Sequence, residues 1–418
     1  MENEGIIDQK IAKKIIETVG VNGIPPEYGF QYFTVGFDEY LKTIEEEYLK
    51  TFIKDGGSVF KMVKGAYGSG KTHFLYCIRE KAWEYNYIVS YISLSPNETP
   101  FSRLDLVYKA IVTNLIYPQT PERLLEGYDK GIEAVIKAWY RRKYDETSKS
   151  VSGDDLKVEL NSYATTIGSG YRSVSFRNGV KNAFLSLLER KDDDFTIILQ
   201  WLMGENPPRN SLKNFGIFEK IDRSTAFNMI RCLVQWLREI GYAGLIVLMD
   251  EAEIGCSMSS RNREALLTNL RELIDECGHT DFKNTMFFYA VPDEQFLNGR
   301  QQIYEALRQR LSTVFDNKHN PRGVKIDLTN ILGEPDRILF EIGVKLSCIY
   351  ETAYNVKFDK RLLNESIKNI AKAAYDKKLE SGYMRLFVKS VIHAFDMIPS
   401  STEPISMKDA EHIVAQMM

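Results

Sequence analysis

Apolar residues recur along the chain at two spacings, one typical of helices and one typical of strands. Near the N-terminus, Ile7, Ile11, Ile15 and Val19 fall on one face of a helix, which Gly20 is expected to end. Alternating or continuous apolar runs predict strands at 59–64, 87–94, 245–249 and 285–290. Helical spacing predicts helices at 38–52, 73–84, 104–116, 224–240 and 266–277. Ser224 is the expected N-cap of the fourth.

Strands and helices alternate in this part of the chain. Strand, loop, helix and strand in succession are typical of a parallel sheet that is covered by helices. The run 245–249 is apolar at every position, as expected of a strand that is buried on both faces. The sequence therefore predicts an α/β fold with a parallel sheet flanked by helices.

The pattern changes between residues 118 and 218. Helical stretches are predicted at 132–139, 176–188 and 195–202, whereas 147–175 is rich in Ser, Gly and Tyr and is expected to be flexible or irregular. This region is too long for a simple loop inside a compact domain. We interpret it as a mainly helical insertion.

Three parts of the chain follow from these patterns. Residues 1–35 are expected to form an N-terminal helical arm, and 36–324 a core that carries the insertion. The remainder, 325–418, is predicted to be wholly helical and to form a C-terminal lid domain, with apolar stripes at 362–370 and 387–392.

Composition narrows the class of protein. Hydrophobic residues make up 44% of the 418 residues and charged residues 27%, with a net charge of −3, so the totals do not indicate a polyanion partner. The five cysteines are scattered along the chain, which favours reduced thiols in a cytosolic protein and gives no zinc-ligand spacing. The longest strongly apolar run, 243–249, is far too short to cross a bilayer. We expect a cytoplasmic protein without membrane contact.

A phosphate-binding pattern, G-x-x-x-x-G-K-[ST] or Walker A, follows the first predicted strand. Glycines let backbone N–H groups converge on phosphate oxygens, and the next helix directs its positive dipole end to the same place. Lys71 is expected to reach the β and γ phosphates of ATP, and the Thr72 hydroxyl to bind Mg²⁺. The pattern occurs by chance about once or twice in a hundred chains of this length. The expected nucleotide-contacting residues are Gly65, Ala66, Tyr67, Gly68, Ser69, Gly70, Lys71, Thr72 and His73, of which His73 is expected to pack rather than to catalyse.

Two carboxylates end the apolar strand 245–249, as in a Walker B motif. The carboxyl edge of a parallel sheet is where such folds bind ligands. Asp250 is expected to hold Mg²⁺, and Glu251 to act as the general base on the attacking water. The alternative is a solvated acidic turn after a core strand. Glu253 is expected to have a solvated or structural role.

An adjacent glutamate indicates the branch of P-loop ATPases with an extra strand between the two motifs. In that branch a polar residue near the end of the strand here predicted at 285–290 often senses the γ phosphate. The chain has Val291 in this stretch and no Asn or Thr, so the sensor is undefined.

Three arginines are further candidates. Arg308 or Arg310 could act in trans on a neighbouring subunit's ATP, as an arginine finger in a homo-oligomer, and Arg385 could reach the phosphates from the lid. For each, a solvated helix face is an equally good interpretation.

One basic cluster, Arg141-Arg142-Lys143, lies in the insertion beside several aromatic residues. Such a cluster can neutralise phosphates while an aromatic ring stacks on a base. The favoured interpretation is a helix whose aromatics pack inward. We therefore expect at most weak DNA binding that added salt reduces and that has no sequence preference.

Several segments resemble AAA+ ATPases of the origin-recognition and STAND-like kind, and more closely the BrxC/BrxD ATP-binding family of bacterial BREX phage-defence systems. The similarity covers most of the chain, and Val291 departs from it where such proteins often have Thr. The resembling strings are Ile15-Ile16-Glu17, Gly23-Ile24-Pro25, Val35-Gly36-Phe37-Asp38, Tyr67-Gly68-Ser69-Gly70-Lys71, Trp201-Leu202-Met203-Gly204-Glu205, Gly241-Tyr242-Ala243-Gly244 and Leu248-Met249-Asp250-Glu251-Ala252-Glu253.

The resemblance implies a role in antiphage defence beside a helicase partner, with the ATP cycle remodelling or licensing a defence complex. It also implies that Phe33 and Val35 pack on adenine, although a strand edge with a turn explains this segment equally well. Two alternatives stay open, a DNA-binding motor or loader and a nucleotide-dependent switch with little turnover. Only about 95 residues follow Gly323, too few for a lid and a winged helix, which argues against the motor.

Overall fold

The apolar runs form one six-stranded sheet in the computed structural model. This structure describes residues 7–252, 258–279, 282–297, 302–316, 320–331, 334–378, 382–398 and 402–418. The order across the sheet is β3-β2-β4-β5-β1-β6. The strands are β1 (Ser58–Lys64), β2 (Ile88–Ser93), β3 (Leu115–Ile116), β4 (Leu245–Asp250), β5 (Thr285–Val291) and β6 (Lys325–Asp327).

The strand order confirms the α/β fold class and the extra-strand arrangement. Strand β5 pairs in parallel with both β1 and β4, and so separates the strand before the glycine loop from the strand that ends at Asp250. Strand β2 pairs in parallel with β4 on its other side. The short β3 is the antiparallel exception, at one edge. All four predicted strands are confirmed.

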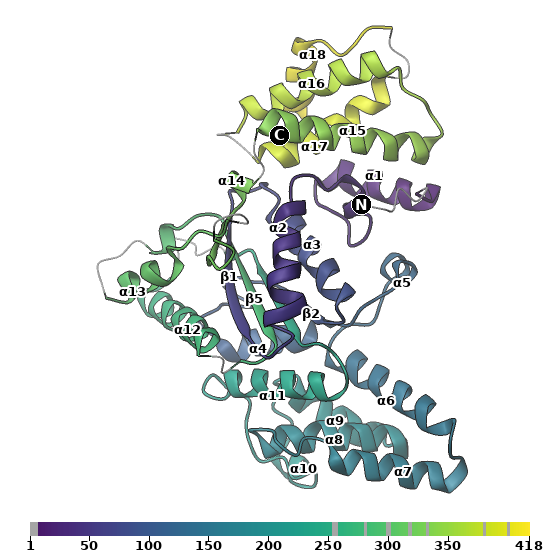
Figure 1. Ribbon diagram of the computed structural model, residues 1–418, viewed down its shortest axis with the longest axis vertical. Coiled ribbons are helices and arrows are strands. Elements are labelled where there is room, and N and C mark those ends of the chain that lie inside the picture. The colour runs from purple at the N-terminus through teal and green to yellow at the C-terminus, as the bar shows by residue number, and fades with distance from the viewer. Residues whose placement is uncertain are drawn as a thin grey trace.

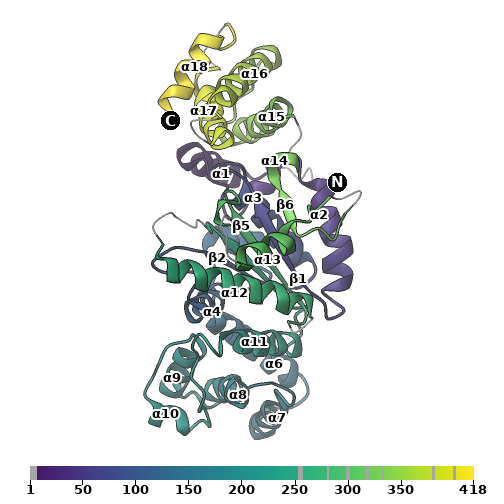
Figure 2. The ribbon, with the colours of Figure 1, turned by 90° about the vertical axis from the view of Figure 1, so that its left-hand side faces the viewer.

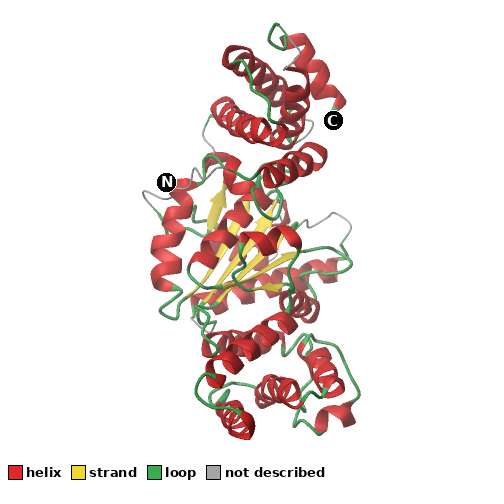
Figure 3. Ribbon diagram, turned by 90° about the vertical axis from the view of Figure 1, so that its right-hand side faces the viewer, coloured by secondary structure: helices red, strands yellow, loops and turns green. Residues whose placement is uncertain are grey.

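Helices cover both faces of the sheet, as Figure 3 shows. Leu245, Val247 and Met249 of β4 belong to the core under α4 (Leu104–Thr113), α11 (Ala226–Glu239) and α12 (Ser260–Gly278). Ile246 and Leu248 belong to the core on the opposite face, under α2 (Asp38–Ile44), the π-helical η2 (Glu45–Phe52) and α3 (Lys71–Glu84). Every residue of β4 is buried, which explains why the run is apolar throughout.

Residues 132–218 form a helical tier at one end of the molecule, opposite the C-terminal bundle (Figure 1). The prediction that 147–175 is irregular was wrong, because Gly153–Thr166 is helical and buries Leu156, Leu160 and Ala164. The helices of this tier are α6 (Ile132–Ser148), α7 (Gly153–Thr166), α8 (Val174–Glu189), α9 (Asp192–Leu202) and α10 (Arg209–Lys213). The preceding helix α5 (Pro121–Glu126) lies beside the sheet instead.

The C-terminal bundle packs against the first helix of the chain. Helix α1 (Gln9–Asn22) contacts α15 and α17, so the N-terminal arm and the lid share one core (Figure 2). The region after 323 is not wholly helical, because β6 adds to the edge of the sheet beside β1 before the bundle begins. The bundle and its approach contain α14 (Leu328–Ile331), α15 (Pro335–Tyr354), α16 (Lys360–Asp376), α17 (Tyr383–Met397) and α18 (Met407–Gln416).

Three predicted helix boundaries were also wrong. Helix α1 runs through Gly20 and ends at Asn22, and Gly23, with a φ of 60°, is its left-handed cap. The helix predicted at 104–116 ends at Thr113. Thr225 rather than Ser224 precedes the first residue of α11, and the Ser224 hydroxyl donates instead to Asp222. Within the described ranges, no helix combines the length and apolar character needed to cross a membrane.

Candidate functional site

The glycine loop connects β1 to α3 at the carboxyl edge of the sheet. Gly68 and Gly70 have φ values of 69° and 89°, which non-glycine residues adopt only at a cost. A Cβ atom on Gly68 would lie 2.8 Å from the Cα of Gly382, where the lid touches the loop. Helix α3 begins at Lys71 without a side-chain cap, so its first N–H groups are directed to the loop and can bind an anion.

Lys71 lies folded over this loop. Its Nζ donates to the carbonyl oxygens of Gly65 at 2.7 Å and Ala66 at 3.1 Å. The ammonium group therefore stands at the mouth of the loop, within reach of a phosphate held there.

Asp250 is buried and accepts three hydrogen bonds. Its Oδ2 accepts from the Thr72 hydroxyl at 2.6 Å and from the Tyr91 hydroxyl at 2.7 Å. Its Oδ1 accepts from the backbone N–H of Glu251 at 2.8 Å. Burial raises the pKa of Tyr91, so this hydroxyl keeps its proton and stays a donor. Carboxylate and hydroxyl oxygens are the ligands that Mg²⁺ prefers, and Asp250 and Thr72 bring one of each together.

Glu251 is exposed and points into the same pocket. Its φ of 55° lies in the left-handed region, an uncommon conformation for a residue with a side chain that recurs at functional sites. The Ser93 hydroxyl donates to its carboxylate. Strand pairing explains this contact, because Ser93 lies opposite Asp250 in the register of β2 and β4. Glu253 lies outside the described residues.

The sequence did not reveal Tyr91 and Ser93 as members of this site. Both come from β2, which has no motif of its own, and the only signal was that β2 would lie beside β4. Strand β5 ends at Val291, which is buried, and the next residue, Pro292, lines the pocket. Neither residue has the polar side chain of a γ-phosphate sensor.

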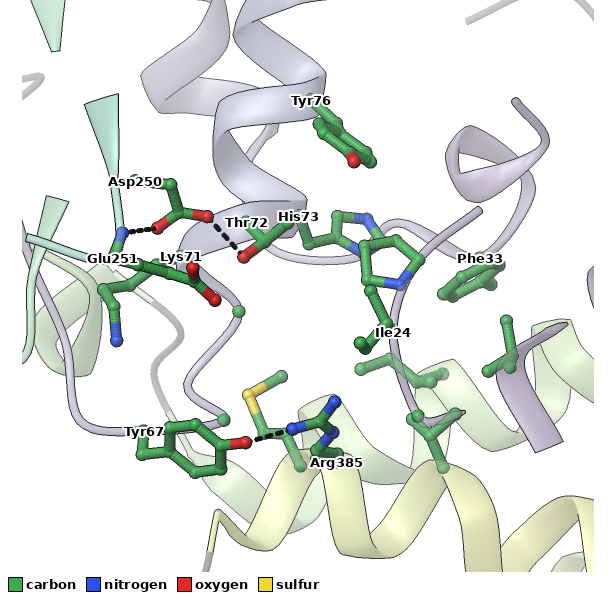
Figure 4. A pocket seen from close by; sticks show the side chains of 18 of the residues that line it. Ile24, Phe33, Tyr67, Lys71, Thr72, His73, Tyr76, Asp250, Glu251 and Arg385 are labelled. Atoms are coloured by element: carbon green, nitrogen blue, oxygen red, sulfur yellow. Dashed lines mark hydrogen bonds between the residues drawn. The ribbon is translucent and has the colours of Figure 1, made fainter. Parts of the chain in front are cut away.

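These groups surround a cavity of about 410 Å³ between the sheet and the lid (Figure 4). At one end lie Lys71, Thr72, Asp250 and Glu251. The other end is mainly apolar, and Phe33 and Val35 both line the cavity. Side chains from α1, its following loop, α15 and α17 complete this wall, namely Val19, Ile24, Pro25, Phe33, Val35, Phe37, Ile342, Met384 and Val388.

Arg385 reaches the cavity from α17. Its Nε donates to the carbonyl oxygen of Asn22 at 2.9 Å, and a terminal guanidinium nitrogen donates to the Tyr67 hydroxyl. The carbon at the centre of the guanidinium lies 5.5 Å from the centre of the Tyr67 ring. The arginine therefore joins the lid, the N-terminal arm and the glycine loop at the cavity, as Figure 4 shows for Tyr67 and Arg385.

His73 also lines the cavity. Its ring centre lies 5.6 Å from that of Phe30 and 5.3 Å from that of Phe33, and its Nε2 lies 2.6 Å from the Thr34 hydroxyl. Burial lowers the pKa of His73 to about 4, so the imidazole is neutral at physiological pH.

The other two candidate arginines are not brought to this cavity. Both lie on α13 (Gln302–Leu311). Arg310 pairs through two hydrogen bonds with Asp275 of α12, and Arg308 donates to the carbonyl oxygen of Leu297 at 3.4 Å. A role in trans concerns a neighbouring subunit and stays a prediction.

The basic cluster of the insertion is largely engaged within the protein. Arg142 donates to the carbonyl oxygen of Ile240, and its guanidinium lies 5.6 Å from the centre of the Tyr242 ring. The Nζ of Lys143 lies 4.6 Å from the centre of the Tyr163 ring. Arg141 is exposed. Two of the three basic side chains thus have contacts within the chain, and DNA binding stays a prediction.

A family model described as "BREX system ATP-binding protein BrxC/D" matches residues 7–412. The chain belongs to this family. The match extends from α1 through the insertion to α18, so all three tiers of the molecule are part of the BrxC/D family pattern. Comparison with curated proteins gave no significant match. Membership makes this a BREX-system ATP-binding protein. In this BrxC/D member, the cavity beside the glycine loop brings Lys71, Thr72, Asp250 and Glu251 together.

Proposed function

We propose that this BrxC/D family member binds Mg-ATP in the cavity between sheet and lid and hydrolyses it. The observation that carries the proposal is the convergence of Lys71, Thr72, Asp250 and Glu251 on one cavity of about 410 Å³. Phosphoryl transfer to water requires groups that hold the phosphates, groups that hold Mg²⁺ and a base for the water. The loop amides with Lys71, the pair Thr72 and Asp250, and the exposed Glu251 would supply these in turn.

Each residue has a separate role in this proposal. The amides of the glycine loop and Lys71 would hold the phosphates, while Thr72 and Asp250 would hold Mg²⁺, which would neutralise charge on the phosphates. Glu251 orients the attacking water and accepts its proton. Phe33 and Val35 contact the adenine, and Arg385 contacts the phosphates when the lid is closed.

The ATP cycle would act on other proteins of the BREX system, with a helicase as the expected partner. The cavity is lined by residues of α1, the sheet edge and the lid, so a change at the phosphates reaches both ends of the chain. We infer that this movement remodels or licenses a defence complex. DNA contact, if any, would be weak and sensitive to salt, and would be strengthened by the partner.

Replacement of Glu251 by Gln tests hydrolysis directly. The amide keeps the shape and the Ser93 contact but cannot accept a proton, so turnover should fall by about 10² or more while Mg-ATP binding persists. Glu84→Gln, a change of the same kind at an exposed position at the end of α3, is the matched control and should leave the rate unchanged. An unchanged rate in Glu251→Gln would show that Glu251 is not the base.

A nucleotide-dependent switch with little turnover is the second candidate. It is favoured by the hydrogen bond from Ser93, which holds the Glu251 carboxylate, and by the apolar end of β5. The same assay decides between the two, because a switch binds Mg-ATP but shows a negligible rate even in the unaltered chain.

A further inference from the structure

His73 stands between the two ends of the cavity. It follows Thr72 directly, and Figure 4 places it between Thr72 and Ile24. In Figure 4, Lys71, Thr72, Asp250 and Glu251 lie on one side of it, and Ile24 and Phe33 lie on the other. A nucleotide held as proposed would therefore bring its nucleoside part, rather than its terminal phosphates, beside this imidazole.

The surroundings fix which ring nitrogen carries the proton. The Thr34 hydroxyl lies 3.0 Å from the carbonyl oxygen of Phe30 and 2.6 Å from the Nε2 of His73. A carbonyl oxygen can only accept, so the single hydroxyl proton must point to Phe30 for that contact to be a hydrogen bond. Both contacts are hydrogen bonds only if Nε2 carries a proton and donates it to Thr34.

The remaining nitrogen, Nδ1, is then a hydrogen-bond acceptor. Within the described residues it has no hydrogen-bond partner, and the side chain is partly exposed at the cavity wall. The ring is held edge-on against the rings of Phe30 and Phe33, with centres 5.6 and 5.3 Å away. His73 thus offers the cavity one fixed acceptor at a position set by Thr34.

We propose that His73 is a specificity-determining residue whose Nδ1 accepts a hydrogen bond from the nucleoside part of the bound nucleotide. This inference rests on the proposed function and adds to it a basis for nucleotide specificity. The donor is either the 6-amino group of adenine or a ribose hydroxyl, since both present a proton where an acceptor can take it. A 6-oxo purine has a carbonyl oxygen in place of the amine, so an acceptor would face the acceptor Nδ1. No hydrogen bond could then form, and binding of the 6-oxo purine would be weaker.

Three diphosphates identify the donor. With Mg²⁺ present, ADP, IDP and 2′-deoxy-ADP are titrated against the unaltered chain and against His73→Phe, which keeps a ring without nitrogens. An amine donor predicts that the preference for ADP over IDP falls about tenfold in His73→Phe, and a ribose donor predicts the same fall for ADP over 2′-deoxy-ADP. Unchanged ratios for both pairs would overturn the inference.

Two further variants separate this role from simple packing. His73→Asn keeps an acceptor near the position of Nδ1 and should retain the preference that His73→Phe loses. Equal loss in both variants would contradict the proposal. Lys71→Ala should weaken all three diphosphates alike, so failure of the phosphate site is distinguishable from failure at His73. If the unaltered chain binds none of the three, the proposed function and this inference both fail.

The tautomer can be read without any ligand. Nitrogen-15 NMR of the chain, which contains five histidines, assigns His73 by its loss in His73→Asn. Near neutral pH, Nδ1 should be unprotonated and Nε2 protonated. Thr34→Val removes the hydroxyl that fixes this tautomer, so both tautomers should then be seen. A protonated Nδ1 in the unaltered chain would contradict the proposal.

Discussion

Lys61 is a fully buried cation on β1 that no carboxylate pairs with within the described residues. Its Nζ donates to the Tyr48 hydroxyl at 2.8 Å and to the carbonyl oxygens of Gly323 at 2.6 Å and Pro321 at 3.3 Å. The side chain therefore fastens the segment before β6 to the sheet. Burial lowers the pKa of Lys61 to about 7 from its usual 10.5.

This shift predicts how stability depends on pH. Below pH 7 the amine is charged in both folded and unfolded chains, and the full cost of burying the charge is present. As pH rises from 7 to 10.5, the folded chain binds fewer protons than the unfolded chain, so this cost disappears. Relative to Lys61→Met, the unaltered chain should gain on the order of 3 kcal/mol in unfolding free energy between pH 7 and 9.5. Urea unfolding at both pH values measures it, and a constant difference would contradict the assignment.

At the scale of single residues, the sequence predicted the parts of the site that are contiguous. Gly65–Thr72 and Asp250–Glu251 are short strings whose local geometry follows from their own residues. Tyr91 and Ser93 could not be predicted, because their place depends on the register that pairs β2 with β4. Register is a long-range property set by the packing of both sheet faces.

At the scale of elements, one ion pair ties the loop after α1 to the helix that carries the phosphate loop. Arg79 of α3 is buried, and its guanidinium donates to a carboxylate oxygen of Glu27 at 2.6 Å and to the Glu27 carbonyl oxygen at 2.5 Å. It lies over the rings of Tyr76 and Trp83, at 4.4 and 4.9 Å from their centres. Since this loop continues into the apolar wall of the cavity, the pair holds that wall in place.

Replacement of Arg79 by Met should loosen this wall. We expect a loss of about 2 kcal/mol in unfolding free energy, moderated because Glu27 can turn to solvent, together with weaker nucleotide binding. The control is Lys81→Met on the same helix, whose ion pair with Glu84 is exposed and should contribute less than about 1 kcal/mol. Equal effects of the two substitutions on binding would show that Arg79 does not position the wall.

The order of elements was largely predictable, whereas their edges were not. Periodicity identified β1, β2, β4 and β5 because at least four residues of each strand are buried. Helix α7 was missed because only Leu156, Leu160 and Ala164 of its 14 residues are buried, which leaves a weak apolar stripe. The strand β6 has three residues, and only its pairing with β1 makes it a strand.

At the scale of the whole molecule, the cavity lies where the two ends of the chain meet the sheet. The bundle of α15–α18 packs on α1 at one end, and the insertion extends from the other end (Figures 1 and 2). None of the described residues of the insertion lines the cavity. A change in the insertion should therefore affect nucleotide binding less than a change in the lid.

Arg308 and Arg310 would link activity to the assembly of several chains. If Arg308 or Arg310 acts in trans, turnover per chain should rise with protein concentration, because each site needs a neighbour. Mixing a double Arg308→Ala, Arg310→Ala variant with Lys71→Ala should then restore part of the activity, since each chain supplies what the other lacks. A rate independent of concentration and an absence of rescue would favour a structural role, as the Arg310 to Asp275 pair suggests.

The central claim is that the cavity beside the glycine loop is where this chain holds Mg-ATP. The most direct measurement is the shift in thermal unfolding that Mg-ATP causes in the unaltered chain and in Lys71→Ala. The loop lies at the surface of the sheet edge, so Lys71→Ala should leave the fold intact and abolish the shift. In the unaltered chain, the shift should correspond to about 2.7 kcal/mol of stabilisation when the ligand concentration is one hundred times the Kd. Equal stabilisation of the two chains by Mg-ATP would contradict the account.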